Sequence, residues 1–313
     1  MRIFTTFLTT FCFLLAITGN AQEQRKFKVH TIAFYNVENL FDTINDTQKF
    51  DEASPIMEMK FNREATYKKK VKNMSRVISE IGADVSKNSP AIIGIAEVEN
   101  REVVEDLAND NALYDKDYGI VHFDSPDARG IDVALMYQKA LFIPIDVSNH
   151  ELKIYDDNTR KRVYTRDQLL VSGKLEGDLI HVIVSHWPSR SGGEARSRPK
   201  RIAAAKLNKR IIDSLQAIDP YAKIFSMGDF NDSGSSESIA SLLENRKFVL
   251  PLMQFPSEHV EGSYKYQGKW ESIDHFLIST DRELTSFKGS IFSIPHLLEP
   301  DDRYTGFRPA RTY

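Results

Sequence analysis

The amino-acid sequence predicts an α/β fold built as one large domain. Short apolar runs of strand length alternate with longer segments whose apolar residues recur at helical spacing. With 313 residues, 41% of them hydrophobic and 11% aromatic, the chain is long and apolar enough for a sizeable core. No short repeat, low-complexity tract or Pro/Gly-rich linker divides it, so a single domain is the simplest interpretation.

The elements follow from these patterns in chain order. The predicted strands are residues 29–37, 91–96, 131–137, 169–175, 179–185, 222–225 and 273–278. The continuous apolar run 91–96 is typical of a strand covered on both faces. Helices are predicted over 67–81 and 195–215, where apolar residues fall on one side of a helix. Long polar loops are expected at 42–59 and 156–162, and loops of this length often shape substrate choice.

The first residues have the features of a secretory signal peptide. Arg2 precedes a largely apolar, uncharged run, and small residues precede Gln22. We therefore expect cleavage after Ala21, which leaves a signal peptide of residues 1–21 and a domain of residues 22–313. The apolar run is short for a membrane span of about 20 residues. No later stretch is apolar enough to cross a membrane, so we expect a secreted or periplasmic protein without stable membrane insertion.

Cysteine content and net charge exclude several kinds of chemistry. Cys12 is the only cysteine and leaves with the signal, so the mature chain has no disulfide and no thiolate metal site. Lys and Arg number 41 against 44 Asp and Glu, a net charge of −3. The electric field of a negatively charged protein does not attract polyanions. A phosphate-bearing substrate must therefore be bound by positive groups at the site itself or with the help of a metal ion.

The segment 227–232 carries the most informative pair of residues. Asp229 and Asn231 follow the predicted strand 222–225 and are two apart, which on extended backbone places them on one face. Open α/β sheets bind ligands at the carboxyl ends of their strands. A charged acceptor beside a neutral donor suits a water nucleophile next to a phosphate oxygen.

Two other strands also end in polar side chains. Asn36 and Glu38 close the first strand on a shared face, a weak signal alone because such residues often begin loops. Glu97 directly follows buried apolar residues. It either caps the helix that follows or supplies a hard oxygen ligand for Mg²⁺. The metal-ligand interpretation is favoured because several strands converge on the same edge.

His186 closes a further strand and precedes a basic segment that begins at Arg190. A lone histidine after a strand is more often structural than catalytic. The cations form either a solvated helix face or a site that neutralises substrate phosphates, and we favour the second for Arg190. Arg129, which opens a strand, reaches either a phosphate or an acidic loop, with equal support for each.

Asp274 lies inside an apolar strand and needs a buried partner. In a hydrolase that partner is typically a histidine held in one tautomer. His275 cannot readily serve, because adjacent strand residues point to opposite faces.

Together these motifs resemble those of the endonuclease/exonuclease/phosphatase superfamily, the group of deoxyribonuclease I, exonuclease III, neutral sphingomyelinases and inositol polyphosphate 5-phosphatases. The resemblance covers residues 28–279, nearly all of the mature chain. The matching motifs occur in the family's order and lie at residues 35–40, Glu97, 185–188, 228–231 and 273–277.

The resemblance implies a four-layer α/β sandwich, in which two mixed β-sheets are flanked by helices. It also implies in-line hydrolysis of a phosphate ester. Glu97, with Asn36 and Glu38, would hold Mg²⁺ or Mn²⁺. The roles implied for the remaining positions are water activation by Asp229, charge stabilisation at phosphorus by Asn231 and His186, and pairing of Asp274 with a catalytic histidine.

One departure from the family pattern affects the functional prediction. The family ends with a Ser-Asp-His motif whose histidine pairs with the aspartate matched by Asp274, and this chain has no such motif. We therefore expect the domain to be incomplete at its C-terminus. The leading prediction is a monomeric Mg²⁺-dependent phosphodiesterase, a nuclease acting on nucleic acid. The alternatives are a sphingomyelinase-like enzyme or small phosphate-ester phosphatase, and a non-catalytic protein that binds phosphate or metal.

Overall fold

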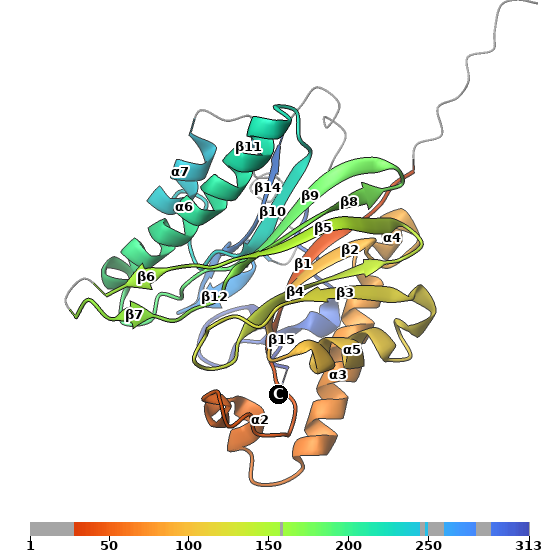
Figure 1. Cartoon of the computed structure of the whole chain (residues 1–313). Coiled ribbons are helices and arrows are strands. Elements are labelled where there is room, and N and C mark those ends of the chain that lie inside the picture. Colours follow the sequence, from red (N-terminus) through yellow and green to blue (C-terminus); the bar gives the residue numbers. More distant parts are fainter. Residues whose placement is uncertain (1–27, 157–158, 245–247, 250–259, 280–288, 313) are drawn as a thin grey trace, which may run out of the picture. The chain divides into compact units, whose positions relative to one another are not determined.

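The structure, a computed structural model, describes residues 28–156, 159–244, 248–249, 260–279 and 289–312 (Figure 1). The chain divides into two compact units, Met1–His30 and Thr31–Tyr313, and the second contains every element that follows. The predicted signal peptide, residues 1–21, lies outside the described residues and stays a prediction. Among the described helices, none has both the length and the apolar character that crossing a membrane requires.

Two mixed β-sheets form the centre of the second unit. The first has the order β1-β2-β4-β3, and the second the order β11-β14-β10-β9-β8-β5. The strands of the first sheet are β1 (Ile32–Leu40), β2 (Ile92–Val98), β3 (Tyr118–His122) and β4 (Asp132–Gln138). Those of the second are β5 (Phe142–His150), β8 (Gln168–Leu175), β9 (Asp178–His186), β10 (Ile224–Asp229), β11 (Phe248–Val249) and β14 (Asp274–Ser279). Each sheet contains one parallel pair, β1 with β2 and β9 with β10, among antiparallel neighbours.

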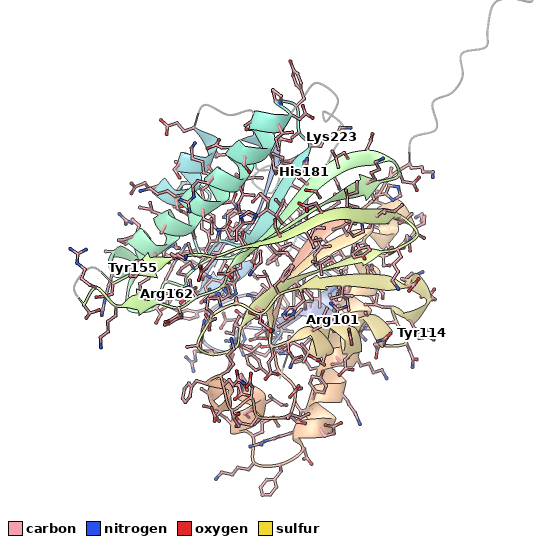
Figure 2. All side chains as sticks on the ribbon, in the orientation of Figure 1. Arg101, Tyr114, Tyr155, Arg162, His181 and Lys223 are labelled. Atoms are coloured by element: carbon pink, nitrogen blue, oxygen red, sulfur yellow. The ribbon has the colours of Figure 1, made fainter. Side chains whose placement is uncertain are left out.

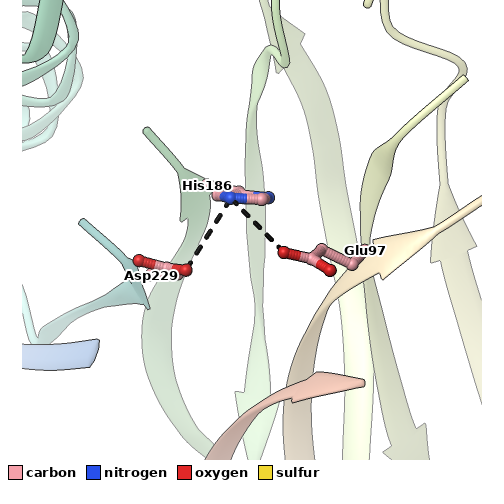
Figure 3. A group of neighbouring side chains, drawn as sticks. All are labelled: Glu97, His186 and Asp229. Carbon is pink, nitrogen blue, oxygen red and sulfur yellow. Dashed lines mark ion pairs between the residues drawn. The ribbon is translucent and has the colours of Figure 1, made fainter. Parts of the chain in front are cut away.

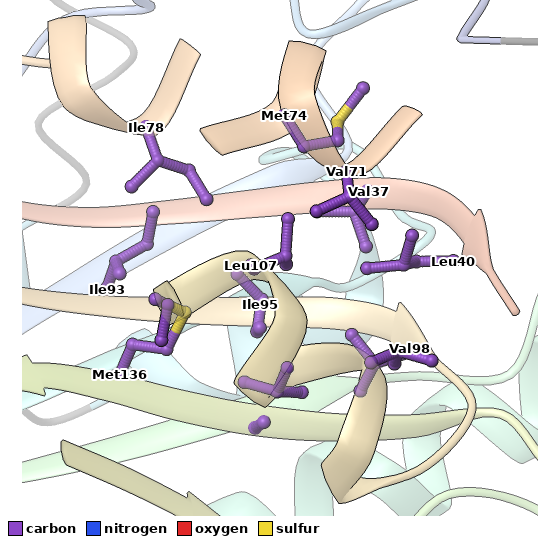
Figure 4. Close-up of a cluster of buried hydrophobic side chains, with 14 of the residues drawn as sticks. Val37, Leu40, Val71, Met74, Ile78, Ile93, Ile95, Val98, Leu107 and Met136 are labelled. Atoms are coloured by element: carbon purple, nitrogen blue, oxygen red, sulfur yellow. The ribbon is translucent and has the colours of Figure 1, made fainter. Parts of the chain in front are cut away.

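Helices cover the outer face of each sheet. On the first sheet lie α3 (Arg63–Glu80) and α5 (Arg101–Asn109), whose buried side chains form one core cluster with β1 and β2 (Figure 4). On the second lie α6 (Glu194–Ile218) and α7 (Glu237–Leu243), which form a second cluster with β9, β10 and β14. Apolar side chains from both sheets form a third cluster between them. The order helix, sheet, sheet, helix is the four-layer α/β sandwich, so the fold prediction is confirmed.

Close packing of the two sheets depends on a glycine. A Cβ on Gly94 of β2 would lie 2.8 Å from the Met227 side chain of β10 and 3.0 Å from that of Val184 on β9. These distances are shorter than ordinary van der Waals contacts, so a larger residue would push the sheets apart. The approach of the two sheets brings the ends of β2, β9 and β10 near one another.

The smaller elements lie at the ends of the sheets. They are the hairpins β6 (Ile154–Tyr155) with β7 (Arg162–Val163), β12 (Tyr264–Tyr266) with β13 (Lys269–Glu271) and β15 (Leu298–Pro300) with β16 (Phe307–Pro309), the helices α2 (Pro55–Glu58) and α4 (Ala83–Ser86), and the 3-10 turns Asp51–Ala53, Tyr114–Lys116 and Pro295–Leu297. Tyr155 and Arg162 mark the first hairpin in Figure 2. This hairpin flanks the predicted loop 156–162, whose residues 157–158 lie outside the described part.

Most predicted elements differ from the observed ones only at their ends. The predicted helix 67–81 begins four residues earlier, at Arg63. The predicted strand 222–225 overlaps only the first two residues of β10, which runs from Ile224 to Asp229. The predicted loop 42–59 contains α2 and a 3-10 turn. Strands β3 and β5 and helix α5 were not predicted. β5 carries exposed apolar residues such as Ile143 and Ile145, which hide the usual alternation of a half-buried strand.

The core between the sheets can be tested with a matched pair of isoleucines. Ile92 on β2 is fully buried between the sheets, whereas Ile145 on β5 is 59% exposed. We expect Ile92→Ala to lower the free energy of unfolding by about 2–5 kcal/mol, because it leaves a cavity. Ile145→Ala should change it by less than about 0.5 kcal/mol. Urea unfolding followed by circular dichroism measures both, and equal effects would contradict the assigned core.

Candidate active site

The register of the second sheet brings three polar residues to adjacent strand ends. Asp229, the last residue of β10, pairs with His186 at the end of parallel β9 and with Asp274 at the start of antiparallel β14. The His186 Nε2 lies 3.7 Å from Asp229 Oδ2 and 3.9 Å from Glu97 Oε1 of the first sheet (Figure 3). Glu97, His186 and Asp229 therefore offer ligand atoms that all lie within 4.8 Å of one another.

A bulge aims Glu97 into this group. Register with both neighbouring strands shifts between Ala96 and Val98, and Glu97 takes a left-handed φ of 65°. Bulges of this kind redirect a side chain beside functional sites. The helix that follows, α5, is capped by Asn100, whose side chain accepts a hydrogen bond from the Val103 N–H at 3.0 Å. Glu97 is therefore not the helix cap, the alternative that the sequence left open.

Asn36 of β1 joins the two sheets at the site. Its Nδ2 donates to Glu97 Oε1 at 3.0 Å and to Asp229 Oδ2 at 3.1 Å. The Asn39 N–H donates to the other Glu97 oxygen at 2.9 Å. Because a single amide group bonds both carboxylates, it holds them close together despite their like charge.

Burial and like charge shift the acid–base properties of the site. Burial first, and then the charge of Glu97, raise the pKa of Asp229 to about 6. Burial and the charge of Asp229 raise the pKa of Asp274 well above its usual value. Burial, with the nearby charges of Arg166 and Arg129, holds the pKa of His186 well below its usual value, so the imidazole is neutral at pH 7. The site therefore gathers negative charge without a positively charged histidine.

These residues fit a divalent metal ion. The carboxylates of Glu97 and Asp229 supply hard oxygen ligands that suit Mg²⁺ or Mn²⁺, with the neutral imidazole of His186 beside them. Asn36, which the sequence also suggested as a ligand, faces them with its amide nitrogen, while its Oδ1 accepts from the Glu38 N–H at 2.9 Å. Asp274 Oδ1 is buried and has no hydrogen-bond partner among the described residues. A cation would relieve the repulsion that raises the pKa of Asp229.

A second group of possible metal ligands lies at the start of β4. It comprises His122, Asp124 and Asp132. Asp132 Oδ1 already accepts hydrogen bonds from the N–H and hydroxyl of Ser125, and Oδ2 lies 3.2 Å from His122 Nε2. This group is therefore satisfied by local hydrogen bonds that shape the loop before β4.

Glu38 lies outside the acidic group, although the sequence placed it beside Asn36. Left-handed φ values of 52° at Glu38 and 55° at Asn39 interrupt the alternation of the strand. The Glu38 carboxylate pairs with Arg311 and accepts hydrogen bonds from the N–H and hydroxyl of Thr312. The ammonium of buried Lys70 donates to the Glu38 carbonyl and to the Thr312 hydroxyl. Glu38 thus anchors the segment near residue 312.

Asn231 lies at the site in a conformation that differs from the expected extended one. It follows the end of β10 with a left-handed φ of 50°, and its N–H donates to Asp229 Oδ1 at 2.8 Å. Its side-chain Nδ2 donates to the Trp187 carbonyl at 3.1 Å. Gly228 allows β10 to approach β9 closely just before this point, because a Cβ there would lie 2.0 Å from the carbonyl oxygen of Ser185.

Among the described residues no histidine pairs with Asp274. The His275 ring bonds the Asp232 carbonyl at 2.8 Å, as expected for a neighbour that points to the opposite face. His296 Nε2 lies 3.6 Å from Glu80 Oε2. The Asp274 N–H instead donates to Ser263 Oγ at 3.2 Å.

The two candidate phosphate-binding arginines are each paired with acids. Arg190 Nη1 lies 2.6 Å from Glu271 Oε2, and its Nε donates to the Asn231 carbonyl at 2.9 Å. Arg129 is exposed and its guanidinium forks onto Asp127, at 3.2 and 3.3 Å. Both lie close to site residues, because Arg190 touches Asn231 and the Arg129 charge acts on His186. His181, in the first half of β9, and Lys223, directly before β10, lie away from the site (Figure 2).

Arg166 and Asp127 are site residues that the sequence did not suggest. Arg166 is 4% exposed, pairs with Asp127 at 3.0 Å and donates to the His186 and Trp187 carbonyls. Burial would raise the pKa of Asp127, but the charges of Arg166 and Arg129 outweigh it and hold that pKa below its usual value. The available signal was the Arg166-Asp167 pair just before the predicted strand 169–175, which is weak because most such charges are exposed.

Comparison with known proteins supports the family resemblance. A family model described as endonuclease/exonuclease/phosphatase family matches residues 31–313. None of the curated proteins matches the chain.

Similar solved structures share the fold at low sequence identity. A mannosyl-6-phosphatase from Bacteroides thetaiotaomicron is 13% identical, with a TM-score of 0.55 over 80% of this chain and 85% of that one. An endonuclease/exonuclease/phosphatase from Bacteroides vulgatus is 14% identical, with a TM-score of 0.52 over 79% and 85%. A humanized D. rerio TDP2 is also 14% identical, with a TM-score of 0.50 over 80% and 83%.

The raised pKa of Asp229 predicts a pH-dependent effect of neutralising it. The unfolded carboxyl ionises near its ordinary pKa of 3.8 and the folded one at about 6, so ionisation destabilises the fold as pH rises through this window. We expect Asp229→Asn, measured with a chelator, to gain on the order of 2 kcal/mol relative to wild type between pH 4 and pH 7. Thermal unfolding across this range measures the difference. The same substitution at exposed Asp146 is the control, and a difference that stays constant with pH would refute an electrostatic origin.

Proposed function

The chain belongs to the endonuclease/exonuclease/phosphatase family, and on that premise we propose that it is a metal-dependent phosphodiesterase, specifically a secreted or periplasmic nuclease. The observation that carries the proposal is the meeting of Glu97, His186 and Asp229 within 4.8 Å at the joined ends of two sheets. The signal-like N-terminus supports an exported protein.

The protein side chains divide the work of in-line hydrolysis. Asp229 can orient the attacking water and accept its proton, because its carboxylate is held at the site by the Asn36 amide and the Asn231 N–H. Neutral His186 can donate an N–H to a phosphate oxygen as charge develops there. Asn36 keeps the two carboxylates in place, and Asn231 lies on the Asp229 side of the same group.

Glu97, with Asp229 beside it, would hold the metal ion, and the Asn36 amide would keep the two carboxylates in position. When bound, Mg²⁺ supplies charge neutralisation for the phosphate and its leaving oxygen. The carboxylates must be ionised to bind the ion, so proton release should accompany metal binding.

The charge of the site favours diesters over monoesters. The candidate phosphate-binding residues Arg190 and Arg129 are each already paired with carboxylates. His186 is held neutral. Their pairing partly neutralises these two arginines, so the positive charge that remains suits the single charge of a diester better than the double charge of a monoester.

Exposed aromatic side chains favour a nucleic acid among the diesters. Tyr264 and Tyr266 on β12 are 41% and 57% exposed, and their rings are parallel within 11°. They follow Ser263, which accepts the Asp274 N–H. Bases stack on exposed rings of this kind without sequence preference. A small footprint also agrees with the near-neutral net charge of the chain.

A substrate panel tests the proposed function. The protein is incubated with and without Mg²⁺ on single- and double-stranded DNA, RNA, sphingomyelin and a sugar phosphate monoester. We expect Mg²⁺-dependent hydrolysis of DNA or RNA, and a loss of at least about 10³-fold in Glu97→Gln, because the neutral amide weakens metal binding. Exposed Glu102→Gln on α5 is the matched control and should retain activity.

Each arm of that panel has a distinct meaning. Hydrolysis of sphingomyelin alone would leave a phosphodiesterase but refute the nuclease. Hydrolysis of the monoester alone would refute the charge argument. Metal binding without turnover of any substrate would favour the non-catalytic alternative, and activity that survives Glu97→Gln would refute the site.

The role of Arg129 predicts a binding defect on substitution. Its guanidinium is half exposed and is held in place by Asp127, which also binds Arg166 behind His186. We expect Arg129→Ala to raise KM about tenfold, equivalent to about 1.4 kcal/mol, while kcat changes little. The reason is that the Arg129 guanidinium would contact the substrate phosphate equally in the bound substrate and in the transition state. Steady-state kinetics on the preferred substrate measure both constants. Arg210→Ala on the exposed face of α6 is the control, and an unchanged KM in Arg129→Ala would contradict the assignment.

A further inference from the structure

We infer that Arg166 is a positioning residue that fixes His186, Asn231 and Arg129 relative to one another. It donates hydrogen bonds to the backbone behind the site and reaches the reacting atoms only through these three residues. The inference rests on the proposed function for its kinetic consequence, whereas its structural consequence can be measured without catalysis.

The first part of the argument is the geometry of one buried guanidinium. Arg166 Nε donates to the His186 carbonyl at 3.2 Å, Nη2 donates to the Trp187 carbonyl at 2.6 Å, and Nη1 pairs with Asp127 Oδ2 at 3.0 Å. Only the rigid fork of an arginine presents donors in three directions from one plane. A lysine keeps the charge but offers a single compact ammonium on a shorter reach.

The Trp187 carbonyl connects Arg166 to Asn231. The same oxygen that accepts from Arg166 also accepts from Asn231 Nδ2 at 3.1 Å. The Trp187 N–H donates to the Asp229 carbonyl at 2.9 Å. The Trp187 ring stacks on Phe230 with 4.2 Å between centroids and 5° between planes. Movement of this carbonyl would therefore shift the amide that we assign to the phosphate side.

Asp127 connects Arg166 to Arg129. One carboxylate oxygen of Asp127 binds Arg166, and the group also accepts from the N–H, Nε and Nη2 of Arg129. The carboxylate is thus shared between a buried and an exposed guanidinium. Without Arg166, Asp127 would lose its buried counter-charge, and the fork that orients Arg129 would be free to move.

Stability alone gives no reason for an arginine at this position. Burying a charged pair costs desolvation that its attraction only partly offsets, so apolar residues of similar volume often serve stability as well. Arg166 bonds backbone atoms of two consecutive residues at the end of β9, one of them in the candidate site. Arg201, another fully buried arginine, contacts Asp232, Glu194 and Ser197, none of which we assign to the reaction.

The experiment compares Arg166→Lys with Arg201→Lys, alone and combined with Asn231→Ala. We expect Arg166→Lys to lower kcat on the preferred nucleic acid at least tenfold. In the Asn231→Ala background, Arg166→Lys should lower kcat by a factor at least threefold smaller, because the side chain that Arg166 positions through Trp187 is already absent. Arg201→Lys should show comparable loss of thermal stability without a change in kcat. Additive effects of Arg166→Lys and Asn231→Ala would overturn the inference.

Amide hydrogen exchange provides the readout that does not need activity. Exchange at the Trp187 and Asn231 amides, measured by NMR, should become at least tenfold faster in Arg166→Lys and stay unchanged in Arg201→Lys. If the wild-type protein hydrolyses no phosphate ester, the proposed function fails and exchange alone decides the positioning role. Unchanged exchange in Arg166→Lys would overturn it.

A second variant covers the case in which Arg166→Lys does not fold. Asp127→Asn keeps both carbonyl contacts of Arg166 but removes the ion pair that orients it. Faster exchange at Trp187 together with a raised KM, the effect expected through Arg129, would support the inference. Asp127→Asn with wild-type exchange and kinetics would refute it.

Discussion

The candidate site depends on like charges held together at the point where the two sheets meet. Glu97 comes from one sheet and Asp229 and Asp274 from the other, and the amide of Asn36 bridges the first two. Buried carboxylates at this distance repel, which is why the pKa values of Asp229 and Asp274 are raised. The arrangement persists because three apolar clusters hold the surrounding strands in place. One cluster lies between each sheet and its helices, and the third lies between the two sheets. The fold thus supplies the energy that keeps an unfavourable charge distribution in place.

Local backbone irregularities, more than the regular strands, decide which side chains enter the site. Glu97 and Glu38, in the last residues of their strands, and Asn231, just beyond the end of β10, all have left-handed φ values. Such conformations cost of order 1 kcal/mol or more each and recur where function requires a particular side-chain direction. In this chain they turn Glu97 inwards and allow Glu38 to serve a different contact. Asn36 and Glu38, two residues apart on β1, therefore have unrelated surroundings.

The sequence predicted the layers and most of the site because both depend on simple periodic patterns. Apolar runs identified β2, β9, β10 and β14, and the polar residues that end them are the ones that the structure gathers. The position of Glu38 could not be predicted, because alternation along a strand assumes a regular backbone and the bulge breaks it. Arg166 was missed for another reason. Arg166 bonds the backbone carbonyls of residues 20 and 21 positions away, and a pattern of side-chain types carries no information about backbone contacts of this kind.

The contact between Glu38 and Thr312 joins the first strand to a segment near residue 312, so it can form only late in folding. The two residues are 274 positions apart, and Asn36 and Asp229 are separated by 193. A ribosome delivers the chain from its N-terminus, so β1 emerges long before its partners exist. Loop-closure entropy must be overcome before such distant contacts add any stability. The acidic group should therefore be among the last parts to become ordered during synthesis, after both sheets have acquired their inner strands.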